Sequence, residues 1–290
     1  MRTYVDRCVY CGEPGISDEH IVPSGFGGVD VLRKGSCGSC QKIINEEIER
    51  PFADFCQDVR YFRRLGHRRL SKRPTSAPTN VHYDLHLVNT THPKDVDWQE
   101  MDLPYPDRVN MVVLPYLRSP RICSNAPETE DPVLDYWWYS NKSPTEIAPE
   151  DTPAMYAEKM FAWGILYRQL AKIAHCAAVQ KYSLGGFAPF LLDLVLKSDF
   201  SKAAYYVGGK QHPGFPEQTW APSERPFEVW ADVRQLTPGG ARYVTCEIRL
   251  LADLFCYRKT TSPVYLVIAG RAAPNISIQY PTIGFPAVPA

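Results

Sequence analysis

The sequence lacks the features that mark several specialised classes of protein. Its formal net charge is zero, with 32 Lys and Arg residues against 32 Asp and Glu residues, so the chain as a whole is neither a polyanion nor a polycation. No segment approaches the roughly 18 to 20 apolar residues that span a bilayer, and the first residues, MRTYVDRCVYC, contain no apolar signal core. The chain has no internal repeat either. We therefore expect a globular cytoplasmic protein that contacts no membrane.

Cysteine is the exception to this ordinary composition. The chain has nine cysteines, an odd number that does not suit a closed set of disulfides in a cytoplasmic protein. Two Cys-x-x-Cys pairs, Cys8 with Cys11 and Cys37 with Cys40, are separated by 25 residues. Four thiolates at this spacing are the ligands that a tetrahedral structural zinc ion needs, and they leave no position for a substrate. The alternative is four unrelated thiols in a Cys-rich stretch.

The segment between the two pairs contains a second pattern. Asp18-Glu19-His20 is followed by Ile21-Val22-Pro23 and then by Gly27-Gly28. This order of a Cys pair, an acid-His-Ile-x-Pro run, a Gly-Gly turn and a second Cys pair that opens a helix resembles the HNH endonucleases of the four-cysteine zinc subclass. The resemblance covers about residues 8–50. It implies a ββα-metal fold, in which the Cys pairs clamp a hairpin against the helix and the His faces a catalytic divalent ion.

The resemblance also implies hydrolysis of phosphodiester bonds in DNA. That reaction needs a base to deprotonate water and a cation to neutralise developing charge. We expect His20 to be the base, because a neutral imidazole is available near pH 7, and Glu19 to be an oxygen ligand of Mg²⁺ or Mn²⁺. The remaining ligand positions of the family correspond to Gln41 and Asn45, four residues apart on one helical face. The alternative for His20 is an exposed loop histidine without a role.

Two departures from the family pattern keep other functions open. Gln41 stands where the family usually has His or Asn, and Asp30 is the nearest equivalent of the family's middle Asn. A nucleic-acid-binding protein that keeps the zinc scaffold without cleaving is therefore the main alternative, and a protein-interaction module is the third. Glu49, one turn beyond Asn45, is interpreted as a solvated acid on the helix surface.

A basic segment follows this helix. Residues 60–73 carry seven Arg or Lys residues and no acid, a composition that suits contact with phosphates rather than with specific bases. Double-stranded DNA is the expected partner. A solvated positive face or a domain junction is the alternative. The predicted nucleic-acid-binding residues are Arg60, Arg63, Arg64, Arg68, Arg69, Lys72 and Arg73.

The expected fold class is α+β, in three segments. Residues 1–59 form the HNH module with its structural zinc, 60–79 the basic segment and linker, and 80–290 a mixed α+β accessory domain of unknown role. One helix is expected from Ser39 or Cys40 onward, with a kink or break at Pro51.

The clearest helix of the accessory domain is expected from Thr152 to Tyr182, and another at 187–198. Lys172 and His175 are interpreted as boundary residues of the long helix. Small buried thiols are expected at Cys176, Cys246 and Cys256. Strands are expected at 81–89, 109–117, 134–140, 203–209, 226–236, 243–255 and 263–270.

Overall fold

The computed structural model describes residues 1–55, 80–87, 97–104, 111–124, 127, 132–140, 163–210, 223, 225–236, 239–252 and 262–276. Three predictions lie outside these residues: the basic segment with its seven predicted phosphate contacts (Arg60, Arg63, Arg64, Arg68, Arg69, Lys72 and Arg73), the helix start at Thr152, and Cys256. The described parts contain both helices and mainly antiparallel sheets, which confirms the α+β class.

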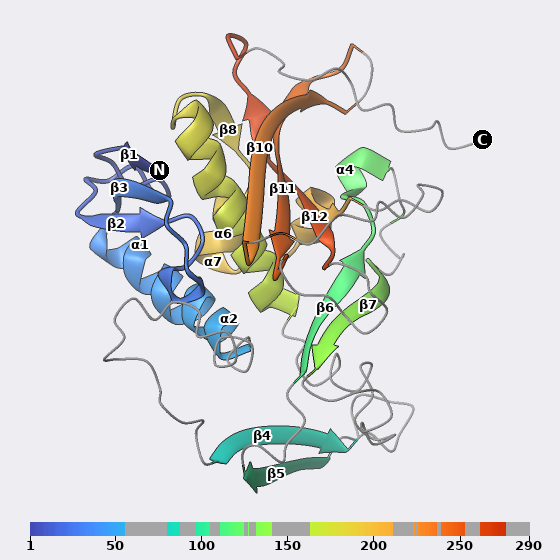
Figure 1. The fold of residues 1–290 in the computed structure, drawn as a ribbon. Coiled ribbons are helices and arrows are strands. Elements are labelled where there is room, and N and C mark those ends of the chain that lie inside the picture. Colours follow the sequence, from blue (N-terminus) through green and yellow to red (C-terminus); the bar gives the residue numbers. More distant parts are fainter. Residues whose placement is uncertain are drawn as a thin grey trace.

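The N-terminal residues form a small sheet followed by a helix. The central strand of the sheet pairs antiparallel with one neighbour and parallel with the other, in the order β1-β3-β2. The helix lies against this sheet (Figure 1). The elements are β1 (Arg2–Tyr4), β2 (Ser17–His20), the 3₁₀ turn η1 (Ser24–Phe26), β3 (Val31–Ser36), α1 (Gly38–Ile43), the π-helical turn η2 (Ile44–Glu49) and α2 (Arg50–Phe55).

The helix does not break at Pro51. It begins at Gly38, with Cys37 as its N-cap residue, and continues to Phe55 through the π-helical turn. Proline has no backbone N–H and its ring clashes with the preceding turn of an α-helix. The wider turn accommodates this position, because the N–H of Arg50 donates to the carbonyl of Asn45, five residues earlier. The predicted disturbance is therefore a change of helix type just before the proline.

The C-terminal half is built on one antiparallel sheet with a long helix across it. The strand order is β10-β11-β12-β8, and β9 also pairs with β12. Helix α6 (Trp163–Tyr182) packs on β10, β11 and β12. The strands are β8 (Phe187–Pro189), β9 (Val207–Gly209), β10 (Phe227–Gln235), β11 (Arg242–Leu250) and β12 (Val264–Ala272).

Other elements correct the predicted strands and helices. The helix expected at 187–198 begins only at Leu192, because residues 187–189 pair with the edge of β12 as strand β8. Residues 203–206 are helical rather than extended. Asp97–Pro104, which were not predicted as a strand, pair antiparallel with Asn80–Leu87. The remaining elements are β4 (Asn80–Leu87), β5 (Asp97–Pro104), β6 (Met111–Leu117), α4 (Arg121–Ser124), β7 (Val133–Ser140), α7 (Leu192–Lys197) and α8 (Ala203–Tyr206).

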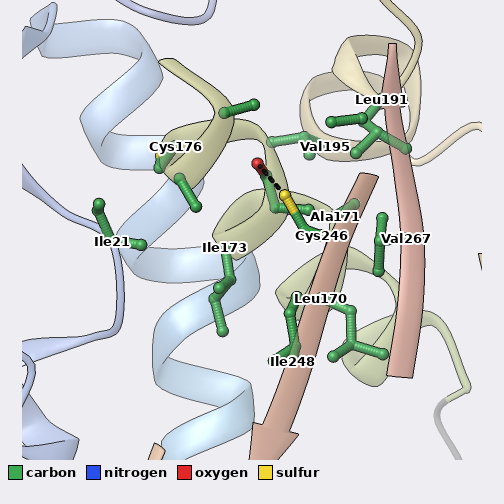
Figure 2. Packing of buried hydrophobic residues seen from close by; sticks show 14 of the residues in the cluster. Ile21, Leu170, Ala171, Ile173, Cys176, Leu191, Val195, Cys246, Ile248 and Val267 are labelled. Atoms are coloured by element: carbon green, nitrogen blue, oxygen red, sulfur yellow. Dashed lines mark hydrogen bonds between the residues drawn. The ribbon is translucent and has the colours of Figure 1, made fainter. Parts of the chain in front are cut away.

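Helix α6 has partners on two sides. Figure 2 shows Ile21 of the N-terminal residues on one side of α6, and Ile248 and Val267 of the sheet on the other. These residues belong to one continuous hydrophobic cluster that also includes Ile44 and Phe52. The N-terminal module and the C-terminal sheet are therefore joined through a shared core.

Because α6 is covered on both sides, the polar residues along its middle are buried. Lys172 is 0% and His175 1% exposed, so the interpretation of both as boundary residues is wrong. Cys176 and Cys246 are buried as predicted, and the Cys246 thiol donates a hydrogen bond to the carbonyl of Ala174 at 3.3 Å. Among the helices in the described part of the chain, none is both long and apolar enough to cross a membrane.

Candidate metal centre

The two Cys-x-x-Cys pairs come together at one end of the small sheet. Cys8 and Cys11 lie in the turn that follows β1, where the Gly12 N–H donates to the carbonyl of Cys8 at 2.9 Å. Cys37 caps the N-terminus of α1, and Cys40 lies in its first turn. The four sulfur atoms all lie within 4.8 Å of one another. The prediction of a four-cysteine group able to hold a metal ion is confirmed.

The spacing of these sulfur atoms fits a tetrahedral ion. Four Zn–S bonds of about 2.3 Å place the sulfur atoms of a tetrahedron about 3.8 Å apart. In the structure the sulfur atoms of Cys11 and Cys37 are 3.6 Å apart. Three of the four cysteines are buried and Cys11 is exposed, so the site is closed on the protein side. Such an ion would stabilise the Gly-rich N-terminal residues without contacting a substrate.

The Gly-Gly turn predicted from the sequence shapes the hairpin between β2 and β3. Gly27 has a φ of +84°, in the left-handed region that favours glycine. A Cβ on Gly28 would lie 1.9 Å from the carbonyl oxygen of Val22, so a side chain cannot be accommodated there. These two glycines let the chain turn back and pair Glu19 with Leu32 and His20 with Val31.

The residues predicted to form the catalytic site differ in exposure. Glu19 is 4% exposed, whereas His20 is half-buried, as expected for neighbours that point to opposite faces of a strand. Gln41 is half-buried and Asn45 is exposed. Asp30, which the resemblance placed nearest to the middle Asn of HNH proteins, pairs with the N-terminal amine. Glu19 pairs with a residue other than Gln41 and Asn45, which were predicted to bind the same divalent ion.

The partner of Glu19 is Lys172 of helix α6. The Lys172 ammonium nitrogen lies 2.8 Å from a carboxylate oxygen of Glu19 and 2.8 Å from one of Glu49. It also donates to the backbone carbonyls of His20 and, at 3.3 Å, of Ile21. We refer to Glu19, Glu49 and Lys172 as the buried ion cluster. The interpretation of Glu49 as a solvated acid is wrong, since its side chain is only 21% exposed and is paired.

Burial and charge act in opposite directions on the members of this cluster. Burial alone would lower the pKa of Lys172, but the carboxylates of Glu19 and Glu49 outweigh it and hold that pKa above its ordinary value. Burial raises the pKa of Glu19, and the nearby Glu49 carboxylate adds to this, while Lys172 opposes it. The ammonium is therefore charged at neutral pH, and two carboxylates share its single positive charge.

Three further polar contacts attach α6 to the N-terminal module. The Nε2–H of His175 donates to the carbonyl of Val9 at 2.7 Å, and the Tyr10 hydroxyl lies 3.2 Å from the sulfur of Cys176. Arg168 forms an ion pair with Glu47 at 3.0 Å. Burial lowers the pKa of His175 to about 4, so its imidazole is neutral at pH 7.

Sequence reasoning missed this side of α6, although one signal was present. Residues 168, 172 and 175 follow helical spacings of four and three, and residue 176 lies four positions after 172, so these side chains share one stripe of an otherwise apolar helix. A polar stripe on a helix indicates either solvent or buried polar partners, and the acidic partners of Arg168 and Lys172 are more than 120 residues away in the sequence.

Comparison with protein-family models, with curated proteins and with solved structures gives no match to this chain. Within the described residues, the cysteines are the only group of three or more His, Cys, Asp or Glu side chains close enough to hold a metal ion. The four thiols fit a structural ion. The predicted Mg²⁺ or Mn²⁺ ligands do not fit a catalytic ion in this arrangement, because the Glu19 carboxylate binds Lys172.

Proposed function

We propose that this protein binds nucleic acid through a zinc-supported module of HNH type that does not cleave its ligand. The observation that carries the proposal is the buried ion cluster. The acid that the HNH resemblance assigns to the divalent ion is 4% exposed and lies 2.8 Å from an ammonium group. Cleavage without the charge of a divalent ion lacks the main means of stabilising the phosphorane.

The scaffold itself supports an origin among the HNH proteins. An antiparallel β2–β3 pair is followed by a helix that the second Cys pair opens, the order of elements that the resemblance implies. Zinc held by the four cysteines would fix the hairpin relative to this helix, and no other chemistry is assigned to it. Affinity for nucleic acid is attributed to the seven basic residues of 60–73, whose contacts with phosphate would be independent of base sequence.

A metal-dependent endonuclease is the second candidate, and the position of His20 favours it. The imidazole is half-buried at the end of β2, and a module that only binds phosphates has no need of an imidazole at that place. In this candidate His20 would be the general base. The ion would then require a set of ligands that does not include the Glu19 carboxylate in its present contacts.

The two candidates are separated by measuring binding and cleavage on the same zinc-loaded, full-length protein. Binding is followed by fluorescence anisotropy with double-stranded DNA at several salt concentrations, and cleavage by nicking of a supercoiled plasmid with Mg²⁺ or Mn²⁺. We expect salt-dependent binding and no nicking, for wild type and for His20→Ala alike. Divalent-dependent nicking that His20→Ala abolishes would establish the endonuclease. Absence of DNA binding at low salt would refute the proposed function.

The source of the affinity is tested by charge reversal in the basic segment. Changing Arg63, Arg64, Arg68 and Arg69 to Glu should weaken binding to every DNA sequence and flatten the salt dependence of binding. A protein that makes fewer phosphate contacts releases fewer counterions from the DNA when it binds. Reversal of Arg33 and Lys34 on β3, which both lie outside the segment, is the control for a loss of positive charge elsewhere in the chain. An unchanged salt slope would assign residues 60–73 to a solvated face.

A further inference from the structure

We infer that the Lys172 ammonium takes the place of a divalent cation, and that removing it converts the buried ion cluster into a binding site for a divalent metal ion. The inference goes beyond the proposed function, because it concerns the cation at this position and not the nucleic acid. Four oxygen atoms surround the ammonium. Two are carboxylate oxygens of Glu19 and Glu49, and two are the carbonyl oxygens of His20 and Ile21.

These oxygen atoms form a set that suits a hard metal ion. An ammonium group has three N–H donors, whereas four oxygen atoms lie around Lys172, and all of them are of the kinds that Ca²⁺, Mg²⁺ and Mn²⁺ bind. They come from strand β2, from the residue after it and from the end of the π-helical turn. A strand and a helix that face each other thus hold one cation between them.

The charge of the set points the same way. Two carboxylates carry two negative charges, and one ammonium leaves one of them unbalanced. A divalent ion would balance both carboxylates, so this pair of acids is better matched to a divalent ion than to a lysine.

Lysine and metal ion are mutually exclusive at this position. Lys172 is 0% exposed, and its helix is fixed to the module by the contacts of Arg168, His175 and Cys176. The ammonium therefore cannot move aside for a metal ion while α6 stays packed. Wild-type protein should bind no divalent ion at the cluster, whereas the space left by a shorter side chain would be lined by oxygen atoms.

The test compares Lys172→Ala with wild type, both full-length and zinc-loaded, in thermal unfolding with added Ca²⁺, Mn²⁺ or Mg²⁺. The melting temperature of Lys172→Ala should rise by about 5 °C at a cation concentration of about 100 times the dissociation constant. Ca²⁺ should be at least as effective as Mg²⁺, because it accepts oxygen atoms at about 2.3–2.6 Å in flexible geometry. Wild type and Lys181→Ala, the control for an exposed lysine on the same helix, should each shift by less than about 1 °C.

A second variant keeps the test decisive if Lys172→Ala does not fold. The double variant Glu49→Gln with Lys172→Ala has the same net charge in the cluster as wild type, and should bind Ca²⁺ where wild type binds none. Where Lys172→Ala also folds, the double variant should bind Ca²⁺ about tenfold more weakly than Lys172→Ala, because one charged ligand is gone. Isothermal calorimetry measures both dissociation constants. The inference is overturned if neither variant gains stability or binds a cation at the cluster. Failure of wild type to bind DNA would refute the proposed function and leave this result unchanged.

Discussion

The strongest prediction concerns the free energy of unfolding when Lys172 loses its charge. Lys172→Met retains the length of the side chain but leaves Glu19, which is 4% exposed, without a positive partner. Breaking a buried ion pair by removing one partner costs about 3–5 kcal/mol. Because Glu49 is 21% exposed on its side chain and can turn toward water, we expect the lower half of that range, about 3–4 kcal/mol.

Glu19→Met should cost less than Lys172→Met. The ammonium keeps Glu49 at 2.8 Å and the carbonyl of Ile21 at 3.3 Å, so it is not left unpaired. The loss is that of one charge-assisted contact, about 1.5–3 kcal/mol. The double variant Glu19→Met with Lys172→Met should be more stable than Lys172→Met alone by about 2 kcal/mol, because two apolar side chains leave no buried charge from this pair.

The measurement is urea unfolding of zinc-loaded protein, followed by the fluorescence of the six tryptophans. Midpoint and slope together give the free energy for each variant. Glu46→Met is the control, since Glu46 is an exposed acid in the same helical turn as Glu49. Its loss should change the free energy of unfolding by less than about 0.5 kcal/mol. The reasoning is refuted if the double variant is less stable than Lys172→Met, or if Glu19→Met costs as much as Lys172→Met.

Three further predictions address the zinc, the buried imidazole and the division into segments. Protein purified without added metal should contain about one Zn per chain by elemental analysis, and Cys37→Ser should lose it and unfold the N-terminal residues; metal-free protein with ordered N-terminal residues would contradict this. Burial lowers the pKa of His175 from 6.5 to about 4, so between pH 6.5 and pH 4 the unfolded chain binds more protons at this residue than the folded chain does. The contribution of His175 to the free energy of unfolding is thus fully present above pH 6.5 and falls by about 1.4 kcal/mol per pH unit as the pH drops toward 4. His175→Gln should remove this contribution, and equal slopes of unfolding free energy against pH for wild type and His175→Gln would refute the prediction. A fragment of residues 1–59 with zinc should fail to give dispersed amide signals by NMR, because its apolar face packs on α6 in the intact protein.

Local spacing accounts for what the sequence predicted well. A Cys-x-x-Cys pair is a tight turn plus two ligands, so its geometry follows from four consecutive residues, and the helix begins within two residues of the predicted place. Gly27 and Gly28 likewise reflect constraints from their immediate neighbours. Such features are set by interactions over short stretches of chain, which a single sequence displays directly.

The partners of α6 could not be predicted in the same way. Lys172 pairs with Glu49 across 123 positions and with the carbonyl of His20 across 152. Periodicity identifies the buried face of a helix only when one face is buried, and α6 packs on the sheet as well as on the module. The lysine and histidine interrupt an apolar pattern, and without knowledge of their distant partners they resemble residues at the edge of a core.

The presence of the Glu19-His20 pair therefore does not by itself indicate an active nuclease. An acid that binds a divalent ion and an acid that binds an ammonium group obey the same chemical requirement, a carboxylate oxygen directed at a positive charge. Either role preserves the acid at position 19. What distinguishes them is the identity of position 172, which lies on another element and outside the motif. In this chain, the residue facing the acid from the packed helix is therefore the more informative position for deciding whether a metal ion is bound.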